Sequence, residues 1–237
     1  MQRYFAKEKS GNYIILQDSD MHHIKNVMRM NNEDNIECII DGRLYLCKVG
    51  DVSENQFLIV QEIDENNELD VGITIAIGLV KEQKMDLILQ KLTELGVKRI
   101  IPVSMERSIV RLDDSKFKKK KARWEAICKE ASEQSHRNVI PEITDVKSIK
   151  ELNNVNADLK LVCSVKEREK IINECLQENR NCATMIFVIG PEGGISDREE
   201  ELLHSFGYQS VSLGTRVMRV ETAAIYVASI MNFCSMR

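Results

Sequence analysis

The part of the chain after residue 70 alternates apolar segments with amphipathic ones, and this alternation limits the possible folds most narrowly. Residues 73–80 (ITIAIGLV) form an almost continuous apolar run, which is typical of a strand buried on both faces. Further strands are expected at 99–103, 159–165, 184–189 and 211–213, and helices at 84–95, about 116–135, 166–178, 197–206 and 221–233. This order of strands and helices predicts an α/β domain with a mostly parallel sheet.

Two of these helices carry boundary signals. Ser196 and Glu199 form a capping box at the start of the helix at 197–206. Gly96 is suited to end the helix at 84–95. That helix places its apolar residues on one stripe, which consists of Met85, Ile88, Leu89, Leu92 and Leu95.

Residues 1–70 predict a small, mostly β module. Short, partly alternating apolar runs occur at 12–16, 35–40, 43–50 and 56–63. Asp41-Gly42 lies between two of them and indicates a hairpin turn. One helix is expected at Ser19–Met30, with Ser19 or Asp20 as its N-cap. Because ENNELD at 65–70 resembles a linker, we expect two domains, 1–70 and 71–237.

Composition narrows the class of protein. Seven scattered cysteines without a C-x-x-C pair favour a reduced cytoplasmic protein with buried thiols over a disulfide framework. The four histidines lack ligand spacing with Cys or Asp, so no metal site is predicted. No apolar run approaches the roughly 20 residues that span a bilayer. The first residues have no apolar core of a signal peptide.

Charge is distributed unevenly along a chain whose net charge is only −4. Residues 1–70 contain 7 Lys/Arg against 14 Asp/Glu, whereas residues 98–123 contain 10 against 3. Such a basic stripe can guide a polyanion. It can equally be a solvated helix face, and charge alone does not decide between these interpretations.

The loop Gly190-Pro-Glu-Gly-Gly194 follows the apolar strand at 184–189, where α/β folds usually bind ligands. Its glycines permit positive φ and close approach of a ligand to the backbone. The P-loop and G-x-G-x-x-G patterns are both missing. Glu192 would repel phosphates, so a ligand with a positive or neutral reacting centre fits better. The alternative is a tight glycine turn without function.

A second polar loop, Leu213 to Glu221, joins a strand to the last helix. Arg216 and Arg219 present cationic donor forks, which suit phosphate or an anionic base edge. Glu221 and Thr222 fall in the first helical turn, where an acidic side chain also complements the helix dipole. The presence of Glu221 at this position is therefore explained equally by a structural role and by a functional one.

Together, GPEGG and LGTRVMRVETAA (213–224) resemble the RsmE-type 16S rRNA (uracil-N3)-methyltransferases of the SPOUT superfamily. The segments HHIKNVMRM (22–30), KEQKMDLILQKLTELGVKRIIPV (81–103), ERS (106–108) and EASEQSHR (130–137) extend the resemblance over most of the chain. Two departures are His136, where a small residue such as Gly is expected, and Glu82-Gln83, where Gly is common.

This resemblance implies an N-terminal PUA-like β-barrel, a SPOUT α/β domain with a deep trefoil knot, and a homodimer. It implies S-adenosylmethionine-dependent methylation of uridine N3 in 16S rRNA of the small ribosomal subunit. N3 belongs to the Watson–Crick edge, so the uridine must be unpaired or flipped. The alternatives are ribose 2′-O methylation by another SPOUT enzyme and a non-catalytic rRNA-binding assembly factor.

Residue roles follow from the resemblance and the chemistry. Arg219 is the candidate for stabilising the imide anion that develops on uracil, and Glu221 for holding Arg219 or accepting the N3 proton. The predicted cofactor-binding residues are Leu161, Cys163, Ile189, Gly190, Pro191, Glu192, Gly194, Leu213, Gly214, Met218 and Thr222. The predicted RNA phosphate contacts are Arg29, Lys81, Lys84, Arg107, Arg111 and Arg137.

Overall fold

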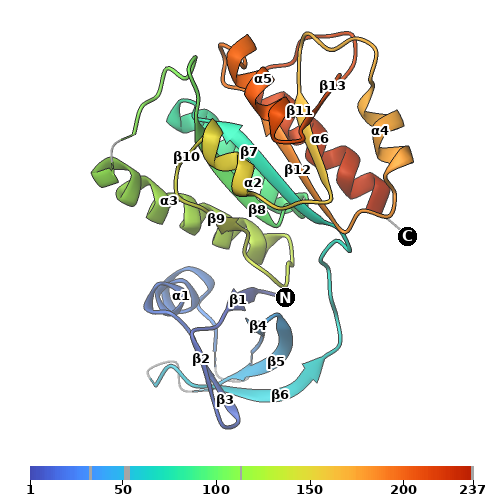
Figure 1. Cartoon of the computed structure of the whole chain (residues 1–237). Coiled ribbons are helices and arrows are strands. Elements are labelled where there is room, and N and C mark those ends of the chain that lie inside the picture. Colours follow the sequence, from blue (N-terminus) through green and yellow to red (C-terminus); the bar gives the residue numbers. More distant parts are fainter. Residues whose placement is uncertain (32–33, 51–53, 113, 236–237) are drawn as a thin grey trace. The chain divides into compact units, whose positions relative to one another are not determined.

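The computed structural model describes residues 1–31, 34–50, 54–112 and 114–235. The chain divides into two compact units (Figure 1). The first unit comprises Met1–Glu68 together with Lys129–Val139, and the second comprises Leu69–Cys128 together with Ile140–Arg237. In the described part of the chain, no helix is long and apolar enough to cross a membrane.

The first unit is built on a six-stranded sheet, counted over the described residues, with the order β1-β4-β5-β6-β3-β2. Its strands are β1 (Arg3–Phe5), β2 (Glu8–Ser10), β3 (Tyr13–Ile15), β4 (Asn35–Ile40), β5 (Arg43–Val49) and β6 (Phe57–Ile63). The predicted hairpin at Asp41-Gly42 is confirmed, since both residues have positive φ and Ile40 pairs with Arg43 across the turn. β1 and β2 were not expected, because three-residue strands are too short to show a period.

The helix expected at Ser19–Met30 differs in start and in winding. An α-helical turn, α1 (Asp18–His22), is followed by a π-helical segment, η1 (His23–Met28). The N-cap is Gln17, so the prediction of Ser19 or Asp20 as the cap was wrong. The helix ends where Arg29 adopts a left-handed conformation with φ of 50°.

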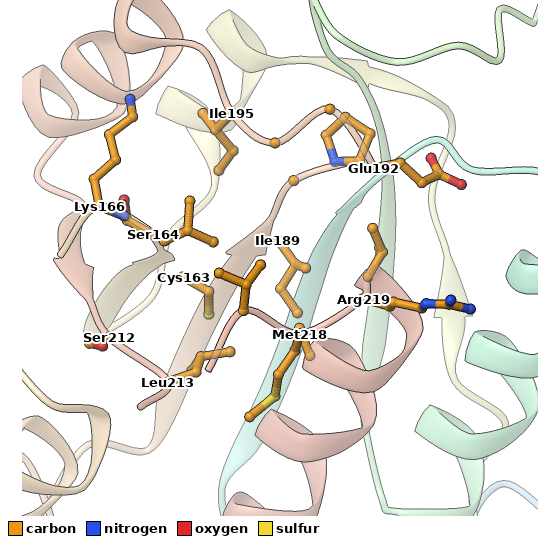
Figure 2. A pocket seen from close by; sticks show the side chains of 18 of the residues that line it. Cys163, Ser164, Lys166, Ile189, Glu192, Ile195, Ser212, Leu213, Met218 and Arg219 are labelled. Atoms are coloured by element: carbon orange, nitrogen blue, oxygen red, sulfur yellow. Dashed lines mark hydrogen bonds between the residues drawn. The ribbon is translucent and has the colours of Figure 1, made fainter. Parts of the chain in front are cut away.

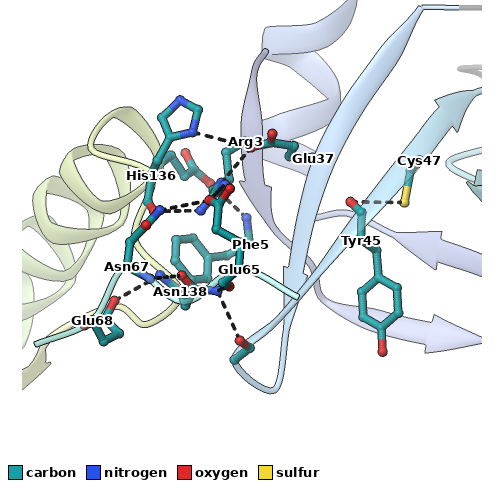
Figure 3. Close-up of polar contacts among 12 residues, drawn as sticks. Arg3, Phe5, Glu37, Tyr45, Cys47, Glu65, Asn67, Glu68, His136 and Asn138 are labelled. Atoms are coloured by element: carbon teal, nitrogen blue, oxygen red, sulfur yellow. Dashed lines mark hydrogen bonds and ion pairs between the residues drawn. The ribbon is translucent and has the colours of Figure 1, made fainter. Parts of the chain in front are cut away.

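Arg3 is the centre of a buried polar network in the first unit (Figure 3). Its side chain is fully buried and donates to Glu37 Oε2 at 2.8 Å, to Glu65 Oε1 at 2.8 Å and to the carbonyl of His136 at 2.6 Å. The carbonyl of His136 also accepts from Asn67 Nδ2 at 2.9 Å. These bonds fasten His136, which follows the long helix α3 (Asp114–Gln134), to β1 and to the segment after β6.

The neighbouring residues of this segment add to the network. The guanidinium of Arg137 binds the carboxylate of Glu68 at 2.5 Å, and Asn138 Nδ2 donates to the carbonyl of Glu65 at 2.8 Å. His136 has φ of +57°, a conformation that costs a side chain about 1–2 kcal/mol and glycine nothing. The small residue expected at this position is therefore explained by the backbone.

The second unit contains a seven-stranded sheet, counted within the same described ranges, in which every pairing is parallel, as predicted. Its order is β10-β8-β7-β12-β11-β13, and β9 pairs with the other end of β8. The strands are β7 (Gly72–Gly78), β8 (Arg99–Ser104), β9 (Glu142–Ile143), β10 (Lys147–Ser148), β11 (Leu159–Cys163), β12 (Thr184–Ile189) and β13 (Gln209–Val211).

Helices cover both faces of this sheet because alternate residues of each central strand point to opposite sides. In β12, Phe187 packs into the core shared with α2 and α6, and Val188 into the core shared with α5. The helices are α2 (Glu82–Glu94), α3 (Asp114–Gln134), η2 (Ile149–Asn154, a 3-10 helix), α4 (Ile172–Glu178), α5 (Asp197–Ser205) and α6 (Val220–Ser235). The capping box of Ser196 and Glu199 and the left-handed Gly96 after α2 are confirmed.

Two boundaries in the second unit were predicted wrongly. The helix expected at 166–178 begins only at Ile172, because Glu167 turns its carboxylate back onto the backbone N–H groups of residues 168–170. Such a side-chain bond competes with helix formation. The strand expected at 211–213 is instead Gln209–Val211, followed by a single bridge at Ser212, so residues 213–219 remain for the following loop.

Replacing Arg3 by Met should lower the free energy of unfolding of the first unit by about 3–5 kcal/mol, because Glu37 loses a buried cationic partner. Denaturant unfolding of the full chain, followed by circular dichroism, measures the change. Arg43→Met is the control, since Arg43 forms an exposed pair with Glu62 whose loss should cost at most about 1 kcal/mol. Equal effects of the two changes would contradict the role assigned to Arg3.

Candidate functional site

The loops that follow β11, β12 and β13 meet around one cavity of about 510 Å³ in the second unit (Figure 2). They meet because the three strands are parallel, so their carboxyl ends lie at one edge of the sheet. The volume lies in the range of small-molecule sites. The two loops singled out in the sequence, at 190–194 and 213–219, therefore belong to one site.

Apolar side chains form the middle of the cavity and charged ones its ends. Cys163, Ile189, Leu213 and Met218 line the middle, and Figure 2 shows Lys166 at one end and Glu192 with Arg219 at the other. Burial raises the pKa of Cys163 to about 12, so this residue stays a neutral thiol and contributes an apolar surface. The cavity suits a flat, largely apolar group with polar substituents at both ends.

The glycines of the GPEGG loop are needed for two different reasons. Only Gly194 has a positive φ, of +73°. A Cβ on Gly193 would lie 2.8 Å from the Cβ of Arg107 and 3.0 Å from its carbonyl oxygen, and a Cβ on Gly190 would lie 2.8 Å from Ile195. The loop therefore packs against its surroundings without room for side chains, and this packing fixes the cavity wall.

An ion cluster ties this loop to α2 and α6. Lys84 Nζ lies 3.0 Å from Glu192 Oε1 and 3.7 Å from Glu221 Oε2. The hydrogen bond to Glu192 raises the pKa of Lys84, so its ammonium is a fixed charge and not a base. Partial burial raises the pKa of Glu192, but the hydrogen bond from Lys84, a backbone hydrogen bond and the charges of Lys84 and Lys81 together leave that pKa below its usual value.

Arg219 is exposed on the cavity rim, and Glu221 lies beside Lys84. Within residues 1–31, 34–50, 54–112 and 114–235, no hydrogen bond or ion pair joins the Arg219 guanidinium to an acid, Glu221 included. The Oε2 atom of Glu221 is buried and has no hydrogen-bond partner among the described residues. The cation that faces Glu221 is thus Lys84, which sequence reasoning had assigned to RNA.

The other end of the cavity was not foreseen. Glu200 is 8% exposed and accepts from Ser210 Oγ at 2.7 Å and from Lys166 Nζ at 3.3 Å. Burial raises the pKa of Glu200, yet hydrogen bonds from Ser164, Ser210 and Lys166 lower it below its ordinary value. The signal in the sequence was weak, because Glu200 sits in the first turn of a helix, where acids are common.

The predicted cofactor residues fall into two groups. Two of them, Leu161 and Thr222, do not line the cavity. Leu161 is fully buried in the core, whereas Thr222 is exposed on α6. All the others line it, namely Cys163, Ile189, Gly190, Pro191, Glu192, Gly194, Leu213, Gly214 and Met218. Ser164, the last residue of the segment 161–164 expected to form a further wall of the site, also lines the cavity. The lining includes residues not named as cofactor-binding, which are Val165, Lys166, Arg168, Gly193, Ile195, Glu200, Ser212, Arg216, Val217, Val220 and Ala223.

Most of the residues predicted to contact RNA have protein partners in the structure, and their role toward RNA stays a prediction. Arg137 is 3% exposed and paired with Glu68. Arg107 donates to the carbonyl of Gly193 at 3.3 Å, and Arg111 to that of Glu106 at 3.1 Å. Arg29 and Lys81 are exposed.

The basic stripe at 98–123 is partly neutralised by acids of the second unit. Lys120 binds Glu82 at 2.6 Å, and Lys121 binds Asp145 at 2.9 Å. Arg123 binds Asp86 at 2.6 Å. These pairs favour the interpretation of this stretch as a solvated helix face.

Comparison with known proteins identifies the family. A family model described as an RNA methyltransferase domain matches residues 67–232, and one described as an RNA methyltransferase PUA domain matches residues 16–62. Ribosomal RNA small subunit methyltransferase E of Bacillus subtilis (strain 168) is 38% identical, with 98% of this chain and 96% of the relative covered. The protein of the same name from Aquifex aeolicus (strain VF5) is 32% identical, with 98% and 100% covered.

A solved structure agrees with these relatives. The crystal structure of ribosomal RNA small subunit methyltransferase E from Neisseria gonorrhoeae, bound to S-adenosyl methionine, has 31% sequence identity and a TM-score of 0.86 to this chain. The match covers 98% of this chain and 96% of that one. The resemblance stated from sequence motifs is confirmed, and the chain belongs to the ribosomal RNA small subunit methyltransferase E family, with a PUA domain followed by an RNA methyltransferase domain.

Proposed function

We propose that this protein transfers a methyl group from S-adenosylmethionine to N3 of a uridine in 16S rRNA of the small ribosomal subunit. The observation that carries the proposal is the cavity at the carboxyl edge of the parallel sheet, walled by both polar loops and with Arg219 on its rim. Family membership supports the reaction class, and a relative with S-adenosyl methionine bound supports the methyl donor.

The residues present fit this cofactor. S-adenosylmethionine supplies an electrophilic methyl group on a sulfonium centre. The apolar wall of Ile189, Leu213 and Met218 suits an adenine ring, and the closely packed GPEGG backbone offers polar groups without side-chain obstruction. The carboxylates of Glu192 and Glu200 at the two ends are compatible with a cation-bearing ligand.

The chain's own residues would then act on uracil. Arg219 stabilises the negative charge that develops on the uracil oxygens when N3 loses its proton. It keeps its own proton, because guanidinium is not a practical base. Lys84 holds the carboxylates of Glu192 and Glu221 beside its own ammonium group. These two ion pairs link the cofactor loop to the start of α6.

Several further features belong to the same proposal. We infer from the resemblance that the segment 190–219, with its two polar loops, forms a deep trefoil knot. We also infer that the chain is a homodimer, for which the exposed Tyr226 and Phe233 on α6 offer an apolar surface. We assign RNA binding to a PUA-like domain at 1–70 and methyl transfer to 71–237. Arg29 and Lys81 are exposed and remain candidates for phosphate contacts. A substrate in the ribosome places the enzyme in the cytoplasm.

Methyl transfer is tested with the full chain, radiolabelled S-adenosylmethionine and 30S subunits that lack the modification. Nucleoside mass spectrometry of the product should find 3-methyluridine in 16S rRNA. A ribose-methylated nucleoside would assign the chain to a different SPOUT reaction. Absence of any labelled product, together with bound RNA, would favour a non-catalytic assembly factor.

Arg219→Ala should lower kcat by about 10²–10³, the usual loss when one donor to a developing anion is removed. The affinity for S-adenosylmethionine, measured by calorimetry, should remain close to that of the wild type. Arg219→Lys keeps a cation and should lose less activity. If Arg219→Ala abolishes cofactor binding while the fold is preserved, the role in the uridine step is wrong.

Gly193→Ala should weaken cofactor binding by about tenfold to a hundredfold, because its methyl group would collide with Arg107 and displace the cavity wall. Gly72→Ala is the matched control, since there the added methyl group meets its nearest atom at an ordinary 3.5 Å. Calorimetry measures both, and circular dichroism checks the fold. Wild-type affinity in Gly193→Ala would show that this wall does not contact the cofactor.

A further inference from the structure

The cavity carries more positive charge than its proposed cofactor requires. Five basic side chains and two acidic ones line it: Lys84, Lys166, Arg168, Arg216 and Arg219 against Glu192 and Glu200. S-adenosylmethionine itself has a net positive charge, from one sulfonium, one ammonium and one carboxylate. A surplus of cations therefore calls for a second, anionic ligand at the same place.

Two of the five cations are already neutralised. Lys84 pairs with Glu192 at 3.0 Å, and Lys166 pairs with Glu200 at 3.3 Å and with Asp197. The remaining three are Arg168, Arg216 and Arg219. Throughout the part of the chain that the structure describes, their guanidinium groups form no hydrogen bond or ion pair, and all three are exposed.

Arg168 is presented by a loop with a fixed backbone. The neighbouring carboxylate of Glu167 accepts from the N–H groups of Arg168 and Glu169, both at 2.8 Å, and from that of Lys170 at 3.1 Å. These backbone hydrogen bonds lower the pKa of Glu167. They also occupy the carboxylate of Glu167, which is one of the two acids adjacent to Arg168 in the sequence.

Arg216 is presented by the loop after the adjacent strand. β11 and β13 are hydrogen-bonded neighbours, and the pairing continues beyond them, because Ser212 N donates to the carbonyl of Lys170 at 2.8 Å and Ile172 N to that of Ser212 at 3.0 Å. The loops that contain Arg168 and Arg216 are thereby joined at their bases. Both arginines line the same cavity from adjoining loops.

We propose that Arg168 and Arg216 form a phosphate-binding pair that holds the RNA backbone next to the target uridine. This inference rests on the proposed function. The guanidinium fork matches phosphate oxygens and keeps its charge at any physiological pH. Arg219 remains for the base. Unlike Lys84, Arg107 and Arg137, which bind protein groups, the two arginines have guanidinium groups without a partner among the described residues.

The test uses the full chain with Arg168→Gln, Arg216→Gln and the double change. Arg180→Gln is the matched control: it removes the same charge from an exposed arginine that precedes β12 and so lies at the amino edge of the sheet. Filter binding of labelled 16S rRNA over a range of salt concentrations gives RNA affinity. Calorimetry without RNA gives the affinity for S-adenosylmethionine.

Each single change should weaken RNA binding several-fold and reduce the slope of log K against log salt by about 1, and the double change by about 2. The KM for RNA should rise much more than kcat falls, and S-adenosylmethionine affinity should match that of Arg180→Gln. Weaker cofactor binding with an unchanged salt slope would overturn the proposal and assign the pair to the cofactor carboxylate. Wild-type behaviour in both assays would also overturn it.

The assay separates this inference from the proposed function. RNA binding and its salt slope are measured without methyl transfer, so they report on the arginine pair even if the product is not 3-methyluridine. If the wild-type chain binds RNA with the expected salt slope but transfers no methyl group, the proposed reaction is contradicted and the role of the arginine pair is not. If the double variant methylates RNA normally at low RNA concentration, the role of the arginine pair is contradicted and the proposed reaction is not.

Discussion

Parallel pairing of β7, β12, β11 and β13 is the constraint on which the site depends. In a parallel arrangement every strand ends at the same edge, so three loops that are far apart in the chain must meet there. The central strands β7 and β12 are largely apolar on both faces, so they offer few polar groups for chemistry. Most residues that line the cavity therefore lie in the segments at 164–170, 190–196 and 212–219, and the packing of these segments decides the shape of the cavity.

Elements with a strong period could be predicted from the sequence, and elements without one could not. The strand at Thr184–Ile189, the stripe of α2 and the capping box of α5 each rest on several residues at fixed spacing, and all were located correctly. The turn at 166–170 was missed because a single carboxylate, that of Glu167, competes for the backbone N–H groups that would have started a helix. Two-residue strands such as β9 offer no period at all.

The partners of charged residues were the least predictable feature of the site. Sequence position suggested that Lys84, Arg107 and Arg137 face RNA, since each is basic and lies in a segment that resembles the family. Their partners, Glu192, the Gly193 carbonyl and Glu68, are 69 to 108 residues away in the chain. Such pairing depends on tertiary structure, which neither local spacing nor net charge contains. The cavity loops were found because their signal, glycine and arginine after an apolar strand, is local.

The separation of paired from unpaired cations explains how one cavity can serve two ligands of opposite charge. Lys84 and Lys166 have acidic partners at 3.0 Å and 3.3 Å, so each acts on its surroundings as a dipole whose field falls off quickly. A cation-bearing cofactor can then approach Glu192 and Glu200 without meeting a strong positive field. The arginines stand apart on exposed loops, where an RNA chain can reach them. Pairing thus divides the charged lining into two nearly neutral ion-paired groups and three arginines that are unpaired in the described part of the chain, all within one small site.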